Sequence, residues 1–308
     1  MIEEKKYLKN LVKFLYSSLQ SHQVLHIDLN GQLIGSESDS VSNLSLSHSN
    51  LQNQAVFVQQ NQINQIGLID AIELGSSLGK CTNLSNLTLN LSYNKIGIED
   101  ATCLGSGIGN CNNLSNLTID LKNNKIGAIG ASDLGSGIGK WNQIDAIGAS
   151  GLGSGLEKCT NLQSLILNLW QEQFIYFGLD NQIRDEGALH LGSIIGKFTN
   201  LSNLTLNFSN NSIGVIGGSG LGSGIGKCIN LSNLTLCLQY NQIGSFGASD
   251  LGFGLGKCTN LSNLTLFFEQ CQIGAIGAFD LCCGLGKCTN LSNFKLQLQQ
   301  KQLNYFGL

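Results

Sequence analysis

Apolar residues recur in the same order in successive thirty-residue segments of the chain. In the segment Cys81–Asn110, the first apolar residues alternate with polar ones, at Leu87, Leu89 and Leu91. This is the period of a strand with one buried face. Later apolar residues return at the spacing of a short helix, at Ala101, Leu104 and Ile108. Each segment therefore predicts one strand and one helix, and neither can bury its apolar face alone.

The same scheme extends over most of the chain. Further copies begin at Cys111, Phe198, Cys228 and Cys258, and a partial copy begins at Cys288. Weaker copies precede Cys81. Together they predict nine strands, centred on Ile27, Val56, Leu89, Ile119, Leu167, Leu206, Leu236, Leu266 and Leu296. Internal repetition of this kind is typical of a solenoid in which each repeat packs on its neighbours.

The runs with the spacing L-x-x-L-x-L-x-L-x-x-N-x-I, together with the stretch Asn181–Gly192, resemble leucine-rich-repeat proteins of the ribonuclease-inhibitor type. The resemblance covers residues 21–308. It implies an α/β fold: a leucine-rich-repeat solenoid, curved like a horseshoe, with a parallel concave sheet and short convex helices. It also implies a protein-binding role without a cofactor. The chain departs from the family in two extra residues between strand and asparagine, and in its glycine-rich helices.

The sequence predicts two parts, a capping helix over residues 1–20 and the solenoid over residues 21–308, which is irregular at 141–180. The apolar residues of the first part lie on one helical face and can cover the open end of a solenoid. Docking to a membrane or to a partner is the alternative. No comparable cap follows the last predicted strand, where Tyr305 and Phe306 are candidate partner contacts.

Two irregular copies interrupt the array. Trp141–Lys158 keeps a helix pattern but lacks a strand, which should interrupt the strand ladder or force a helix to bulge outward. The next copy, Cys159–Lys197, carries extra residues rich in aromatic side chains, among them Trp170, Phe174, Tyr176 and Phe177. We consider three explanations: an aromatic loop that contacts a partner, a tolerated loop, or an artefact of the gene model.

Two repeated columns are interpreted as structural. The asparagines that follow the strands should turn inward and bond loop backbone of neighbouring repeats; they are Asn61, Asn94, Asn124, Asn142, Asn181, Asn211 and Asn241, with Cys271 in the next copy. The second column consists of Cys81, Cys111, Cys159, Cys228, Cys258 and Cys288, with Trp141 and Phe198 as substitutes. A position that accepts phenylalanine is an apolar pocket, so these thiols should pack as small hydrophobic groups.

The sequence offers no pattern expected of an enzyme. The recurrent G-S-G-x-G-K stretches lack the spacing of a phosphate loop and end a helix instead of opening one. The adjacent pair Cys282–Cys283 has no histidine nearby, so no metal site is expected. The four histidines are scattered, and no nucleophile elbow or kinase motif is present. We therefore expect a protein that is not an enzyme and that uses no cofactor.

One lysine closes most repeats. We expect these lysines in the last helical turn, where they favour the negative end of the helix dipole; they are Lys80, Lys140, Lys158, Lys197, Lys227, Lys257 and Lys287. Asp133, Asp250 and Asp280 should lie nearer the helix starts, with the complementary sign. The alternative is a basic stripe that engages an acidic protein surface.

The residues between the strand leucines should form the concave face, which is small, polar and almost uncharged. It therefore suits neither nucleic-acid phosphates nor a strongly charged enzyme. The aromatic and charged exceptions are the expected partner anchors: Lys122, Trp170, Phe267 and Glu269.

Charge and composition fit this picture. The 308-residue chain has a net charge of -3, only 12% charged residues and eleven cysteines, with neither an apolar leader nor a membrane-length apolar run. We expect a cytoplasmic protein with reduced thiols and a protein partner, not nucleic acid or a membrane. The predicted role is a non-catalytic scaffold within a cytoskeletal or other large assembly. The alternatives are an inhibitor that wraps an enzyme, or a regulatory fragment of a larger enzyme.

Overall fold

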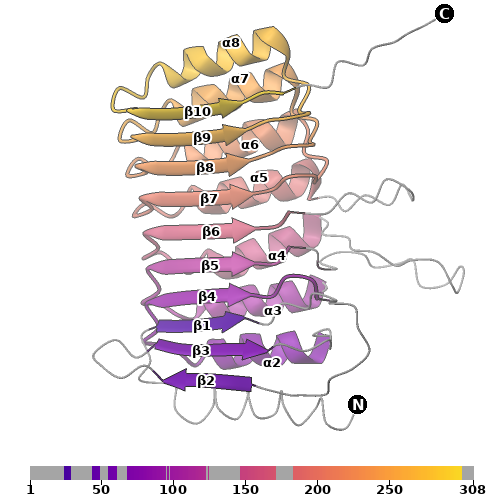
Figure 1. Ribbon diagram of the computed structural model, residues 1–308, viewed down its shortest axis with the longest axis vertical. Helices are drawn as coiled ribbons and strands as arrows, with labels where there is room; N and C mark the ends of the chain where they lie inside the picture. The colour runs from indigo at the N-terminus through magenta and orange to yellow at the C-terminus, as the bar shows by residue number, and fades with distance from the viewer. Residues whose placement is uncertain are drawn as a thin grey trace, which may run out of the picture.

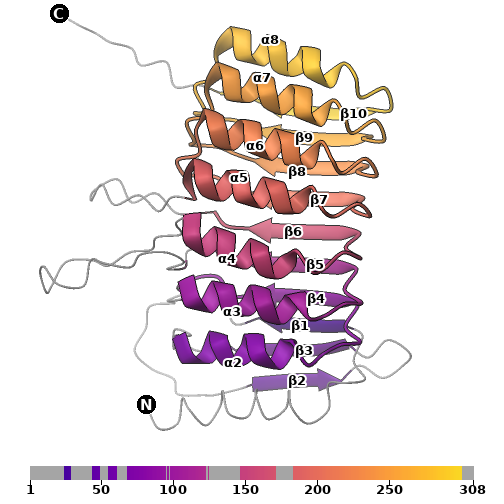
Figure 2. The same cartoon turned by 180° about the vertical axis from the view of Figure 1, so that it is seen from behind.

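The computed structural model describes residues 24–28, 44–48, 55–60, 68–94, 96, 98–122, 124, 146–170 and 183–299. Strands from these segments form one sheet, and helices cover one of its two faces (Figures 1 and 2). The strands are β1 Val24–Asp28, β2 Leu44–His48, β3 Ala55–Gln60, β4 Asn86–Asn90, β5 Asn116–Asp120, β6 Ser164–Asn168, β7 Asn203–Asn207, β8 Asn233–Cys237, β9 Asn263–Phe267 and β10 Asn293–Gln297. The helices are α2 Leu68–Leu78, α3 Ile98–Gly109, α4 Ala146–Leu156, α5 Arg184–Ile195, α6 Val215–Ile225, α7 Gly244–Leu255 and α8 Gly274–Leu285.

The predicted α/β solenoid is confirmed. From β4 to β10 each strand pairs in parallel with the next one along the chain, and equivalent residues of successive repeats lie opposite each other. Figure 2 shows the helix layer spread further along the stack than the strand layer, so the sheet lies on the inner side of the curve. The other face of the sheet is free of helices (Figure 1).

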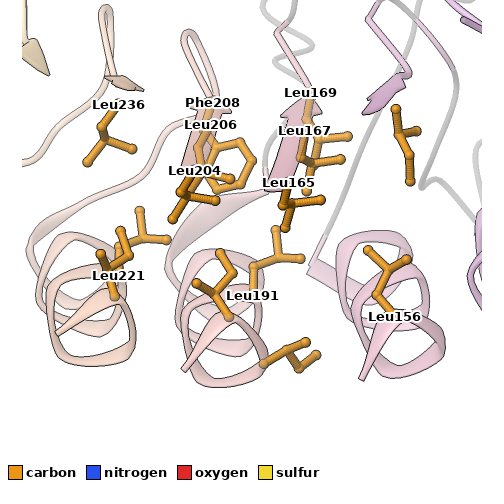
Figure 3. Packing of buried hydrophobic residues seen from close by; sticks show 14 of the residues in the cluster. Leu156, Leu165, Leu167, Leu169, Leu191, Leu204, Leu206, Phe208, Leu221 and Leu236 are labelled. Carbon is orange, nitrogen blue, oxygen red and sulfur yellow. The ribbon is translucent and has the colours of Figure 1, made fainter. Parts of the chain in front are cut away.

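The core lies between the two layers because the strands alternate. In β4, Leu87 and Leu89 are buried, whereas Asn86, Thr88 and Asn90 are partly exposed. Figure 3 shows the same arrangement in β6 and β7, whose leucines lie opposite Leu191 and Leu221 of the helix layer. Burial of one leucine side chain stabilises the fold by roughly 1.5–3 kcal/mol, and each repeat contributes several.

The helical glycines allow neighbouring helices to touch. A Cβ atom at Gly224 of α6 would overlap the backbone of Gly192 in α5, and one at Gly254 of α7 would overlap Gly222 of α6. Backbone contact of this kind needs residues without side chains at the point of contact. Glycine within a helix costs about 1 kcal/mol relative to alanine, so the glycine-rich helices need a compensating contact. The structure shows that the glycines allow a closely stacked helix layer.

The N-terminal strands are not in the expected sequential order. β1 lies between β3 and β4, and β2 pairs antiparallel with β3 at the edge of the sheet. The strands centred on Ile27 and Val56 are paired directly, but in reversed order, because β1 and not β3 lies next to β4; β2 was not predicted. Period-two alternation identifies a strand and its buried face, but it does not identify the neighbouring strand.

The strand ladder is not interrupted near Trp141, and the alternative expectation, a helix that bulges outward, falls on residues outside the described part of the chain. β5 pairs directly with β6, in the same register as every other pair. Helix α4 packs against α3, since a Cβ atom at Gly155 would overlap the backbone of Gly105. Helix α4, which comes from the irregular copy, therefore completes the repeat that begins with β5. In this part of the stack each repeat keeps one strand and one helix. Residues 125–145, which include Trp141, lie outside the described residues, as does the predicted capping helix over 1–20.

Candidate protein-binding surface

The open face of the sheet carries straight columns of polar residues. Residues directly opposite each other across successive strands form the column Thr88, Thr118, Ile166, Thr205, Thr235, Thr265 and Lys295. The neighbouring column is Asn90, Asp120, Asn168, Asn207, Cys237, Phe267 and Gln297. The residues between the strand leucines were expected to share one face, and the pairing confirms that they line up across the strands. Ile166 is the one apolar member of the first column and is exposed.

A third column, which the sequence analysis missed, forms a ladder of side-chain hydrogen bonds. The Nδ2 atom of Asn263 donates to Oδ1 of Asn233 at 2.5 Å, and Asn293 repeats this bond to Asn263 at 2.6 Å. The same bond joins Asn116 to Asn86 and Asn233 to Asn203. Ser164 replaces asparagine in β6, so the ladder is interrupted at this strand. Ladders of this kind stabilise long parallel sheets, and they occupy polar groups that a partner could otherwise bind.

From β4 to β7, the second column fixes the chain where it leaves the strand. Oδ1 of Asp120 accepts the N–H of Lys122 at 3.0 Å, and Oδ1 of Asn168 accepts the N–H of Trp170 at 3.1 Å. These are turns closed by an Asx side chain, two residues ahead of the bonded N–H. They set the backbone position of both predicted anchors. The second column therefore has a structural role in addition to being exposed on the open face of the sheet.

Lys122 and Trp170 come together at the carboxyl ends of β5 and β6. The Nζ atom of Lys122 lies 4.0 Å from the centre of the Trp170 ring and 4.8 Å from that of Tyr93. The backbone N–H of Tyr93 also donates to the carbonyl oxygen of Lys122 at 2.8 Å. An ammonium between two aromatic rings is held by roughly 0.5–2 kcal/mol per ring. We call Tyr93, Lys122 and Trp170 the rim cluster.

The other predicted anchors lie along the same edge, at β9. The Nζ atom of Lys295 is 5.1 Å from the centre of the Phe267 ring. One carboxylate oxygen of Glu269, Oε2, is buried and has no hydrogen-bond partner among the described residues. Three strand spacings separate β6 from β9, about 14 Å at roughly 4.8 Å per strand. A single partner can therefore reach both groups. Phe174, Tyr176, Phe177, Tyr305 and Phe306 lie outside the described part of the chain.

The inward asparagine column is confirmed where the structure describes it. Nδ2 of Asn241 donates to the carbonyl oxygen of Phe208 in the preceding repeat, at 3.0 Å. Its Oδ1 accepts the N–H groups of Asn211 and Ile213. Asn124 and Asn211 make equivalent bonds to the preceding repeat. Cys271 replaces asparagine and directs its Sγ atom to the carbonyl oxygen of Leu238 at 2.8 Å. These residues are structural and leave the open face to other side chains.

The cysteine column is buried, as predicted, and the thiols have a further role that the sequence did not indicate. From Cys111 to Cys288, the Sγ atom of each lies near a carbonyl oxygen at the end of a helix in the preceding repeat, for example Cys258 to Ile225 of α6 at 3.3 Å. Burial raises the pKa of the Cys159 and Cys228 thiols to about 11, and of Cys258 to about 12 with the help of the neighbouring thiols. The described residues contain no group of three or more side chains that could hold a metal ion.

The lysine column differs from the prediction. Lys197, Lys227, Lys257 and Lys287 lie two residues after their helices end, not within the last helical turn. The final helix residue is followed by a glycine that closes the helix, which places each lysine in the next turn. Lys197 forms an exposed ion pair with Glu157 of the preceding repeat.

The helix layer carries exposed apolar residues that the sequence analysis missed. Ile216, Phe246, Ile276 and Phe279 are 61%, 77%, 74% and 68% exposed. The first three occupy equivalent positions in α6, α7 and α8. The available signal was a large apolar residue on the polar side of the helical stripe, which recurs at thirty-residue spacing from Ile216 to Ile276.

No protein-family model matches this chain, and no curated protein matches its sequence. Among the described residues, no helix is both long enough and apolar enough to cross a membrane.

Proposed function

We propose that the chain is a non-catalytic protein-binding scaffold of the leucine-rich-repeat class, resembling the ribonuclease-inhibitor type, and that it works within a larger cytoplasmic assembly. The rim cluster carries the proposal. It places a tryptophan, a tyrosine and a lysine in fixed positions at the edge of a face that is free of helices and that also exposes Ile166. Aromatic residues held in this way dominate protein-binding hot spots.

The composition of the open face favours a scaffold over an enzyme inhibitor. Between β4 and β10 its three strand columns contain only Asp120 and Lys295 as charged residues. An inhibitor that wraps a charged enzyme gains association rate from charge complementarity, which this face offers only at its edge.

The experiment is purification of the native complex from cells that express a tagged chain. Wild type is compared with Trp170→Ala, and with Ile229→Ala as a matched truncation of an exposed apolar residue at the opposite edge of the stack. We expect Trp170→Ala to lose the partner, with affinity reduced about 30-fold for a hot-spot cost of roughly 2 kcal/mol. Ile229→Ala should keep it.

Two results would count against the scaffold. Equal recovery of the partner with wild type and Trp170→Ala would show that the rim cluster does not contribute to binding. A stoichiometric enzyme that loses its activity in the complex and contacts the open face would establish the inhibitor instead.

A further inference from the structure

The outer side of the helix layer carries a second surface, distinct from the rim cluster. We define the outer patch as Ile216 of α6, Phe246 of α7, and Ile276 and Phe279 of α8. Figure 2 shows these three helices side by side on the face turned away from the open sheet. Contact at their first turns is close, since a Cβ atom at Gly277 would lie 2.6 Å from Cα of Ser245, and one at Gly247 would lie 3.2 Å from Cα of Val215. The patch is therefore continuous across three repeats.

The exposure of these side chains has no explanation within the fold. All four are more than 60% exposed, whereas the opposite sides of the same helices bury Leu221, Leu251 and Leu281 completely. Single exposed apolar residues are common on protein surfaces, but contiguous groups mark interaction sites. Here the same exposed position is apolar in three consecutive repeats.

Two carboxylates lie beside the patch. Asp250 follows Phe246 by four residues, and Asp280 follows Ile276 by four, so each lies on the same helical face one turn further on. Neither carboxylate has an ion-pair or hydrogen-bond partner among the described residues. Lys257 and Lys287 follow the far ends of α7 and α8, and the Nζ atom of Lys287 lies 5.7 Å from the centre of the Phe253 ring. The patch is thus apolar with a negative charge beside it.

We infer that the outer patch binds an amphipathic helix of a partner protein, with lysine or arginine flanking its apolar stripe. The apolar stripe covers the isoleucines and phenylalanines, and the basic residues pair with Asp250 and Asp280. An extended peptide fits this surface less well. The helices α6–α8 already use their backbone groups internally, whereas a partner helix also satisfies its own backbone hydrogen bonds.

The experiment measures binding of a labelled eighteen-residue peptide, in which leucines form one helical face and lysines flank it, by fluorescence anisotropy with the full chain. A second peptide replaces the lysines with glutamate. We expect the basic peptide to bind and the acidic one to bind at least tenfold more weakly. The double variant Phe246→Ala/Ile276→Ala and the charge-reversal variant Asp250→Lys/Asp280→Lys should each weaken the basic peptide at least tenfold. Ile229→Ala should bind it like wild type.

The outcomes separate this inference from its rivals. Unchanged affinity in both patch variants, with native circular dichroism, would overturn it. Concentration-dependent dimerisation that the patch variants abolish would assign the patch to a second copy of the chain. Cosedimentation with phosphatidylcholine or phosphatidylserine vesicles that depends on the patch would assign it to lipid. None of these measurements involves the rim cluster. A negative result for the outer patch therefore does not affect the proposed function, and a negative result for the rim cluster does not affect the inference about the outer patch.

Discussion

The side chain of Asn241 joins two repeats, because its Nδ2 atom donates to the carbonyl oxygen of Phe208 in the preceding repeat at 3.0 Å. The same side chain accepts two backbone N–H groups from that repeat, at Asn211 and Ile213. Asn241 is 2% exposed, so water cannot replace these bonds. The inward asparagines therefore determine how each repeat meets the next.

Replacement of Asn241 by alanine should destabilise the fold by about 3 kcal/mol, since several buried backbone groups lose their partners. The urea midpoint of unfolding, followed by circular dichroism, measures the effect. Asn241→Cys should cost less, because Cys271 occupies the equivalent position and bonds Leu238. Asn233→Ala, in the exposed ladder, is the control and should change stability little. Equal losses for Asn233→Ala and Asn241→Ala would contradict the distinction between the two columns.

The helical glycines predict an unusual response to alanine. Gly224→Ala places a methyl group on the backbone of Gly192 and should destabilise the protein by about 1–3 kcal/mol. Alanine in a free helix would instead stabilise by up to about 1 kcal/mol. Gly218→Ala, in the same helix, is the matched control. Its nearest neighbour is a side-chain methyl of Ile243 at 3.2 Å, so a neutral or slightly stabilising effect is expected. The thermal unfolding midpoints of Gly224→Ala and Gly218→Ala, each compared with wild type, measure this difference in stability.

The buried thiols predict a loss of stability at high pH. Their folded pKa values of about 11 to 12 lie above the ordinary value of 9.0, so the folded state keeps protons that the unfolded chain releases. This stabilising contribution is complete below pH 9 and is lost as the pH rises toward 12. Each thiol contributes a slope of about 1.4 kcal/mol per pH unit in this window. Urea midpoints between pH 8 and pH 11 test the prediction, and Cys258→Val should reduce the slope relative to wild type.

The irregular repeat predicts that part of the chain is dispensable. Deletion of residues 125–142 joins Asn124 directly to Gln143, which brings Ile144 to the position that Ile96 holds after Asn94. The result is a repeat of ordinary length, and α4 keeps its packing on α3. We expect the deletion variant to fold with unchanged or slightly higher stability, because the shortened connection costs less closure entropy. A large drop in the urea midpoint would show that the segment contributes to the stack.

The repeat itself could be predicted from the sequence because its information is local. Leu87, Leu89 and the inward asparagines recur at fixed spacing, and this spacing indicates which of these side chains are buried. The order of β1 and β3 could not be predicted, since it depends on which of two similar strands meets β4. The rim cluster was anticipated through Lys122 and Trp170, but Tyr93 was not, because the contact joins three repeats. The outer patch was missed because exposure in a helix depends on the helices packed beside it.

The ladder bonds of Asn233, Asn263 and Asn293 all run in one direction, each from a later repeat to the one before it, through the same pair of atoms. A junction made from identical contacts does not distinguish one repeat from another. Recombination between such similar gene segments can therefore insert or remove thirty codons and still yield matched surfaces at the new junction. An array that changes length in this way keeps its sheet and its helix layer. What changes is the separation between Trp170 and Phe267, and with it the size of partner that can touch both.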